Sequence, residues 1–122
     1  EEKPMQYLYP EGDHFVFMDV ETYEQAHIPK EIIGAALKYL KAGEVCAVKF
    51  NEGMPVVFEI PNFITLRIAK TEPGVKGDTV SGGGKPATLE TGAVVTVPFF
   101  LEEGDLIRVD TRTNTYLERV KE

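Results

Sequence analysis

The stretch PKEIIGAALKYLKAGEVCAVKF, residues 29–50, changes its hydrophobic period halfway along. In its first part the apolar residues recur at spacings of three and four, which is the period of an amphipathic helix. Proline is common in the first turn of a helix and glycine just beyond its end, and Pro29 and Gly43 occupy these places. We therefore predict one helix over about residues 30–41, followed by a strand over Val45–Phe50.

The segments on both sides of this helix are rich in aromatic and β-branched residues and are separated by turn signals. Three strands before the helix and two after it form the element order of an OB-type five-stranded barrel. A small antiparallel sandwich is the alternative for the same elements. The strands expected in this half are Met5–Tyr9, His14–Val20, Gln25–Ile28, Val45–Phe50 and Val56–Ile60.

The second half of the chain consists of strand and turn patterns without a matching helix. One long β-branched stretch, Leu89–Pro98, is expected to be a strand kinked at Gly92. We predict an all-β protein made of two tandem OB-type five-stranded β-barrels, with one short helix in the first barrel. The first domain is expected to cover residues 1–62 and the second residues 63–122. The other strands expected in the second domain are Ile64–Ala69, Leu106–Val109 and Tyr116–Val120.

The composition is that of a soluble globular protein, with 43% hydrophobic and 27% charged residues. A single cysteine, Cys46, excludes an internal disulfide and fits a reducing compartment. The N-terminus lacks the basic and apolar regions of a secretory leader. The longest apolar run, Ala93–Leu101, is too short to cross a bilayer. We expect a cytoplasmic protein with no membrane partner.

The charge is unevenly distributed along the chain. The net charge is −7, and residues 1–62 account for −6 of it, with five lysines against eleven acids. All four arginines lie in residues 63–122. A net negative charge argues against a generic nucleic-acid binder, and we expect no DNA partner. Contacts with phosphate are therefore expected more in the second half than in the first, and local geometry rather than a broad basic face has to provide them.

The glycine-rich stretch GDTVSGGGKP, residues 77–86, does not match the motif of a nucleotide-binding phosphate loop. With Lys85 as the motif's lysine, Thr79 replaces the first glycine and Pro86 replaces the hydroxyl residue that meets magnesium. His14 and His27 lie in strand patterns without metal-ligand spacing, and no catalytic motif is present. We therefore expect a binding module and not an enzyme, with no catalytic residues, metal or cofactor. Asp110 is expected to hydrogen-bond its own turn.

Three long segments resemble the bacterial elongation factor P family. They are MQYLYPEGDHFVFMDVETYEQ (5–25), TEPGVKGDTVSGG (71–83) and KPATLETGAVVTVPFFLEEGDLIRVDTR (85–112). The resemblance implies the middle and C-terminal OB domains of a three-domain factor. The family's N-terminal KOW-type domain, whose lysine reaches the peptidyl-transferase centre, has no counterpart in this sequence. A bacterial elongation factor P-like paralogue shares the architecture and is a second candidate.

The resemblance also implies a function. Members of the family bind the ribosome next to P-site tRNA and relieve stalling at consecutive prolines by stimulating peptide bond formation. Gly77, Asp78 and Thr79 match the family's loop near the E-site messenger codon, and exposed edges of single-stranded RNA suit such polar contacts. The implied partners are the ribosome, P-site tRNA and the E-site codon, bound by a monomer. Candidate contacts to the tRNA or rRNA backbone are Lys76, Lys85, Arg112, Tyr116 and Arg119.

An alternative of a different class follows from the charge of the first half. A net charge of −6 over residues 1–62 suits a protein-interaction module that binds a basic protein partner. Such a module should bind its partner in a salt-sensitive way that does not depend on tRNA.

Overall fold

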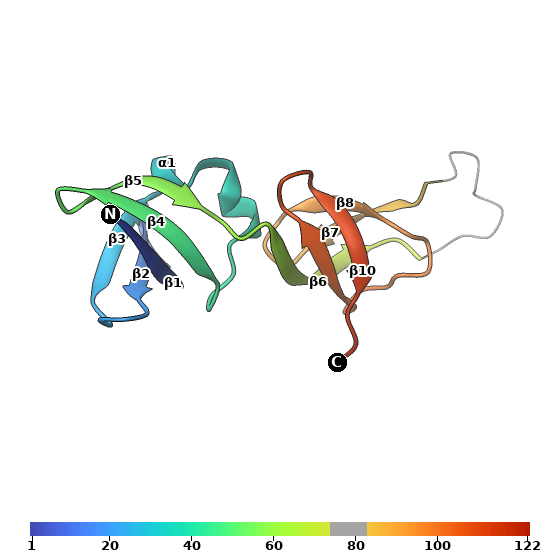
Figure 1. Cartoon of the computed structure of the whole chain (residues 1–122). Coiled ribbons are helices and arrows are strands. Elements are labelled where there is room, and N and C mark those ends of the chain that lie inside the picture. The colour runs from blue at the N-terminus through green and yellow to red at the C-terminus, as the bar shows by residue number, and fades with distance from the viewer. Residues whose placement is uncertain (74–82) are drawn as a thin grey trace. The chain divides into compact units, whose positions relative to one another are not determined.

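A computed structural model of the protein describes residues 1–73 and 83–122. These residues divide into two compact units, Glu1–Pro61 and Asn62–Glu122. Each unit is built on one curled antiparallel sheet of five strands, as Figure 1 shows for each part of the chain. The expected all-β fold with two small barrels is therefore confirmed.

The sheet of the first unit has the strand order β3-β2-β1-β4-β5. Strand β1 is central and pairs antiparallel with β2 on one side and with β4 on the other. The helical segment lies between β3 and β4 in the chain, as the sequence predicts. The strands are β1 (Glu2–Glu11), β2 (His14–Asp19), β3 (Gln25–Pro29), β4 (Val45–Asn51) and β5 (Met54–Glu59).

The helical segment is less regular than the sequence indicates. It consists of one α-helical turn, α1 (Lys30–Ile33), followed by a 3-10 segment, η1 (Gly34–Tyr39). Gly34 has a φ of 62°, which ends the α-helix because an α-helical residue needs a negative φ. The expected short helix over about residues 30–41 is thus present as ten helical residues, 30–39, of which the last six are 3-10 and not α-helical. Its apolar positions still pack on the core of the barrel, with Ile33 only 4% exposed.

The core of the first unit is formed by side chains that alternate along the strands. Phe17, Ile28 and Val48 are completely buried. The ring of Phe17 contacts two further aromatic rings, with centroid distances of 5.2 Å to Tyr7 and 5.5 Å to Phe58. Aromatic residues of this unit therefore contribute to packing inside the barrel.

The sheet of the second unit has the strand order β10-β9-β6-β7-β8. The expected single strand over Leu89–Pro98 is wrong, because a turn at residues 90–93 separates two strands there. Gly92 makes this turn with a φ of 100°. The strands are β6 (Phe63–Thr71), β7 (Lys85–Leu89), β8 (Val94–Val97), β9 (Leu106–Asp110) and β10 (Thr115–Arg119).

The alternation of β6 decides which side chains of the second unit face outward. Ile64, Leu66 and Ile68 are at most 3% exposed and pack in the core. Phe63, Thr65 and Arg67 consequently lie on the outer face of the sheet. Within residues 1–73 and 83–122, no helix is long and apolar enough to cross a membrane.

Candidate nucleic-acid interface

The turn after β9 is organised by the carboxylate of Asp110. This side chain is 12% exposed and accepts a hydrogen bond of 2.9 Å from the backbone N–H of Arg112, which confirms the expected role of Asp110 in its own turn. It also accepts bonds from Nε of Arg112 at 3.1 Å and from Nη2 at 2.9 Å. The side-chain bonds from Arg112 are the main reason why the pKa of Asp110 is lowered. The carboxylate therefore holds the guanidinium in a defined orientation.

The held guanidinium lies beside an exposed aromatic ring. Its central carbon is 5.1 Å from the centroid of the Phe63 ring, which belongs to the neighbouring strand β6. The guanidinium of Arg108 lies 5.3 Å from the same centroid. Both distances are within the range of a cation–π interaction. Phe63 is 43% exposed, so one ring and two guanidinium groups are together accessible on the outer face of β6 and β9.

Acidic side chains offset the charge of these arginines. Arg108 lies 3.7 Å from a carboxylate oxygen of Glu118 on β10, which is a loose ion pair between exposed groups. A guanidinium carries five N–H donors, and the pair with Asp110 engages only those on Nε and Nη2 of Arg112. Within residues 1–73 and 83–122 the Nη1 donors of Arg112 make no such contact. This cluster can bind an anion only through directed hydrogen bonds, because its total charge is close to zero.

The third arginine on this face is committed to another role. Arg67 forms two hydrogen bonds of 2.9 Å to the carboxylate of Glu122 and one of 2.7 Å to the carbonyl of Gly104. These contacts connect β6 with the turn before β9 and with the chain end. Arg67 is therefore better suited to holding the barrel together than to contacting a ligand.

Tyr116 and Arg119 project from the opposite side of the sheet. Tyr116 pairs with Val109 and Arg119 with Ile107, and both partners have side chains in the core. Residues that pair across two strands lie on the same face, so Tyr116 and Arg119 are separated from Phe63 and Arg108. Burial is the first cause of the raised pKa of Tyr116. Of the three candidate RNA contacts near the C-terminal hairpin, Arg112, Tyr116 and Arg119, only Arg112 therefore belongs to the cluster around Phe63.

The remaining candidates have different environments. Lys85 is only 5% exposed, and its ammonium group donates a hydrogen bond to the backbone carbonyl of Glu72. Its role in the structure is to connect the start of β7 with the end of β6, and we do not include it among the proposed RNA contacts. Lys76 and the codon-loop residues Gly77, Asp78 and Thr79 lie outside the described residues.

Two members of the cluster, Phe63 and Arg108, were not among the residues selected from the sequence. Buried and more exposed side chains alternate along residues 63–68, and because Ile64 belongs to the apolar, buried set, its neighbour Phe63 faces outward. However, only the pairing of β6 with β9 brings Phe63 opposite Asp110 and next to both arginines. Among residues 1–73 and 83–122 there is no group of three or more His, Cys, Asp or Glu side chains that could hold a metal ion.

The fold places the protein in the class of tandem β-barrels of OB type, in which nucleic-acid binding is common. Two family models match the chain, "Elongation factor P (EF-P) OB domain" over residues 1–58 and "Elongation factor P, C-terminal" over residues 57–119. Together they cover nearly its whole length, and the chain belongs to the elongation factor P family.

Individual relatives agree with this assignment. An elongation factor P of Thermodesulfovibrio yellowstonii is 57% identical over 122 residues, which is the whole of this chain and 65% of the relative. One from Coprothermobacter proteolyticus is 56% identical over 120 residues, which is 98% of this chain and 64% of the relative. The chain thus spans just under two thirds of the length of these curated relatives.

Proposed function

We propose that this chain is the ribosome-binding part of a translation elongation factor that relieves stalling at consecutive prolines by stimulating peptide bond formation. It binds next to P-site tRNA and helps to orient the rest of the factor. The observation that carries this proposal is the match of the family's OB and C-terminal domains along almost the entire chain. The chain acts by binding and carries no catalytic residues of its own. Its place of action is the cytoplasm, and it works as a monomer.

The cluster of Phe63, Arg108 and Arg112 is the part of the described structure best suited to RNA. Guanidinium groups present paired N–H donors that match phosphate oxygens. An exposed aromatic ring allows an unpaired base to stack, which is a common contact in RNA recognition. The ion pair with Asp110 fixes the guanidinium of Arg112 before the ligand arrives, so less conformational entropy is lost on binding.

The loop Gly77-Asp78-Thr79 is the proposed contact to the E-site codon. This part of the proposal depends on the resemblance of the loop sequence to that of the family. Glycine permits a close approach of the backbone, and the aspartate and threonine side chains offer hydrogen bonds to exposed base edges. The bacterial elongation factor P-like paralogue is the alternative assignment within the same architecture.

Co-sedimentation with ribosomes that hold P-site tRNA tests the proposal. Arg112→Lys keeps the positive charge but loses the forked donor geometry, whereas Phe63→Leu keeps an apolar side chain but loses the aromatic ring. Each change should weaken binding by about 1–3 kcal/mol if the cluster contacts RNA. Arg108→Gln should also make the slope of log K against log salt concentration less steep, by about one for each phosphate contact that the substitution removes.

A matched control is available on β6, the strand that carries Phe63. Lys70 is an exposed residue of β6, and Lys70→Ala removes a positive charge without changing the cluster. This variant should sediment like the unmodified chain. Equal binding by Phe63→Leu, Arg112→Lys and Lys70→Ala would show that the cluster does not contact the ribosome.

A further inference from the structure

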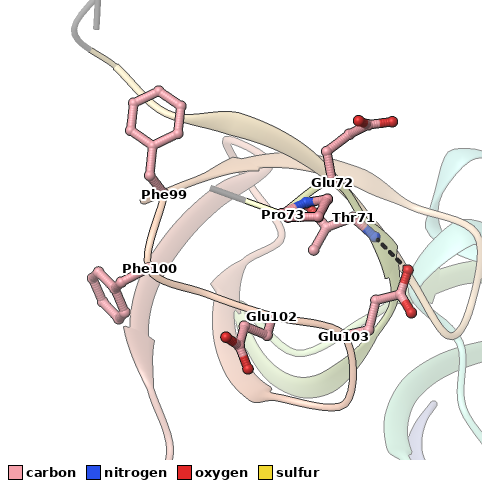
Figure 2. Close-up of a pocket in the computed structure, with 7 residues that line it drawn as sticks. All are labelled: Thr71, Glu72, Pro73, Phe99, Phe100, Glu102 and Glu103. Carbon is pink, nitrogen blue, oxygen red and sulfur yellow. Dashed lines mark hydrogen bonds between the residues drawn. The ribbon is translucent and has the colours of Figure 1, made fainter. Parts of the chain in front are cut away.

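A second surface feature of the C-terminal unit is acidic, whereas the cluster of Phe63, Arg108 and Arg112, which we call the arginine cluster, presents guanidinium groups. A pocket of about 660 Å³ lies between the end of β6 and the turn that follows β8. Figure 2 shows Phe99 and Phe100 at one side of it, Glu102 and Glu103 below, and Glu72 above with its carboxylate directed away from the two rings. We call these five residues the acidic–aromatic pocket. None of the described residues that line it is basic.

The turn that carries the two phenylalanines is held in place by the core. Leu101 is completely buried and follows directly after Phe100, which is 62% exposed. The backbone N–H of Leu101 donates to the carbonyl of Pro98 at 3.2 Å, and that of Glu102 donates to Asp105 at 2.9 Å. With Leu101 anchored, the side chain of Phe100 is directed outward. A large apolar ring is thus held in solvent by the fold.

The carboxylates of the pocket are partly positioned as well. Oε2 of Glu103 accepts a hydrogen bond of 3.3 Å from the backbone N–H of Thr71, which connects the two walls of the pocket (Figure 2). No hydrogen bond or ion pair to the side-chain carboxylates of Glu72 and Glu102 occurs within the described residues. The pocket therefore offers negative charge next to exposed aromatic surface, a combination that suits a cation able to pack on a ring.

We propose that the acidic–aromatic pocket binds an arginine side chain, presented by a basic segment of a protein partner. A guanidinium packs flat on an aromatic ring and forms forked hydrogen bonds to carboxylates, whereas the ammonium of lysine is compact and strongly hydrated. The arrangement disfavours RNA, because three carboxylates repel phosphate. The C-terminal unit then has two contact surfaces of different chemistry, the arginine cluster for RNA and this pocket for protein. The inference goes beyond the proposed RNA contacts and does not depend on them.

An NMR titration of the chain without ribosomes provides the test. The probe is a short peptide of alternating glycine and arginine with both ends blocked. Its addition at low salt should shift the amide resonances of Phe99–Glu103 and of Thr71 and Glu72. The matching lysine peptide should bind more weakly, and the matching glutamate peptide should not bind. Raising the salt to about 0.5 M should weaken the binding of the arginine peptide.

Two variants separate the contributions of ring and charge. Phe100→Ala removes one cation–π contact at an exposed site and should lower the affinity for the arginine peptide about two- to fivefold. Glu102→Gln combined with Glu103→Gln should lower the affinity for the arginine peptide at least about twofold, because two exposed ion pairs are lost. Glutamine retains a carbonyl oxygen that can accept the hydrogen bond from Thr71. The amide spectrum of each variant reports whether the fold is intact.

Controls come from the other unit. Tyr23 is 72% exposed, so Tyr23→Ala removes a comparable aromatic ring, and Glu31→Gln with Glu52→Gln removes the same number of charges. Both controls should bind the arginine peptide as the unmodified chain does. The proposal is overturned if the peptide shifts no pocket amide, or if the controls weaken binding as much as the pocket variants. It is also overturned if a single-stranded oligouridine shifts the pocket amides more than the peptide does.

Discussion

Replacing Gly84 with alanine should destabilise the C-terminal unit, because the added Cβ atom would clash with the backbone of Val97. Gly84 precedes β7 and has a φ of +152°, which L residues rarely adopt. A Cβ atom at this position would lie 2.2 Å from the carbonyl oxygen of Val97 and 2.9 Å from its carbonyl carbon. Ordinary contact begins at 3.4 Å, so the backbone of β8 would have to move by about 1.2 Å, the difference between 3.4 and 2.2 Å.

The expected loss of stability has two parts. The strained backbone costs about 1–3 kcal/mol, and overpacking that forces a backbone shift costs about 1–3 kcal/mol more. The C-terminal unit, Asn62–Glu122, has 61 residues. A unit of this size has a free energy of unfolding of roughly 3–9 kcal/mol. The substitution should therefore remove a large share of that free energy.

Gly104→Ala is the matched control in the same unit. Gly104 has a φ of +93° but no atom within 4 Å of the added Cβ, so only backbone strain of about 1–2 kcal/mol is expected. Urea titration followed by the amide resonances of the C-terminal unit measures both variants. The midpoint should fall more for Gly84→Ala than for Gly104→Ala. Equal midpoints would refute the close approach of Gly84 to Val97.

Three further predictions concern single buried or paired side chains. Asp110 has a lowered pKa, so its ion pair stabilises the folded state above the unfolded pKa near 3.8, and this contribution is lost as pH falls through the lower folded pKa. Asp110→Asn should therefore flatten the acid side of the stability profile of the C-terminal unit, and an unchanged profile would contradict the pairing with Arg112. Burial raises the pKa of Cys46 to about 12, so a thiol reagent at mildly alkaline pH should label it no faster than the first unit unfolds. Leu101→Ala should cost about 2–5 kcal/mol in urea titrations, since Leu101 is completely buried, and a loss below about 1 kcal/mol would show that the turn is not anchored there.

Local patterns in the sequence predict most of the fold. The change of period after Pro29 identifies the helical segment, and the alternation of Ile64, Leu66 and Ile68 identifies the buried face of β6. The pattern does not show the change from α-helix to 3-10 helix at Gly34, because the neighbours of Gly34 favour a helix although its own φ is positive. The start of β7 was missed because Pro86 cannot donate a ladder hydrogen bond and is rare inside a sheet.

The candidate sites were harder to predict, because they depend on strand pairing. Arg112 was selected from the sequence, but its neighbours Phe63 and Arg108 are far from each other in the chain and meet only through the register of β6 with β9. The sequence indicates Lys85 as a possible RNA-backbone contact beside a glycine-rich loop, and no local pattern indicates that its ammonium group donates a hydrogen bond to the carbonyl of Glu72. The acidic–aromatic pocket likewise joins the end of β6 to residues about thirty positions later.

The dependence of ribosome binding on tRNA tests the central claim most directly. The chain should co-sediment with ribosomes that hold P-site tRNA and have an empty E site, and much less with vacant ribosomes or with ribosomes whose E site is filled. Arg112→Lys should lower the bound fraction only in the first case. Equal binding to all three kinds of ribosome, with the same loss at high salt, would contradict the account and favour an acidic module that binds a basic protein partner.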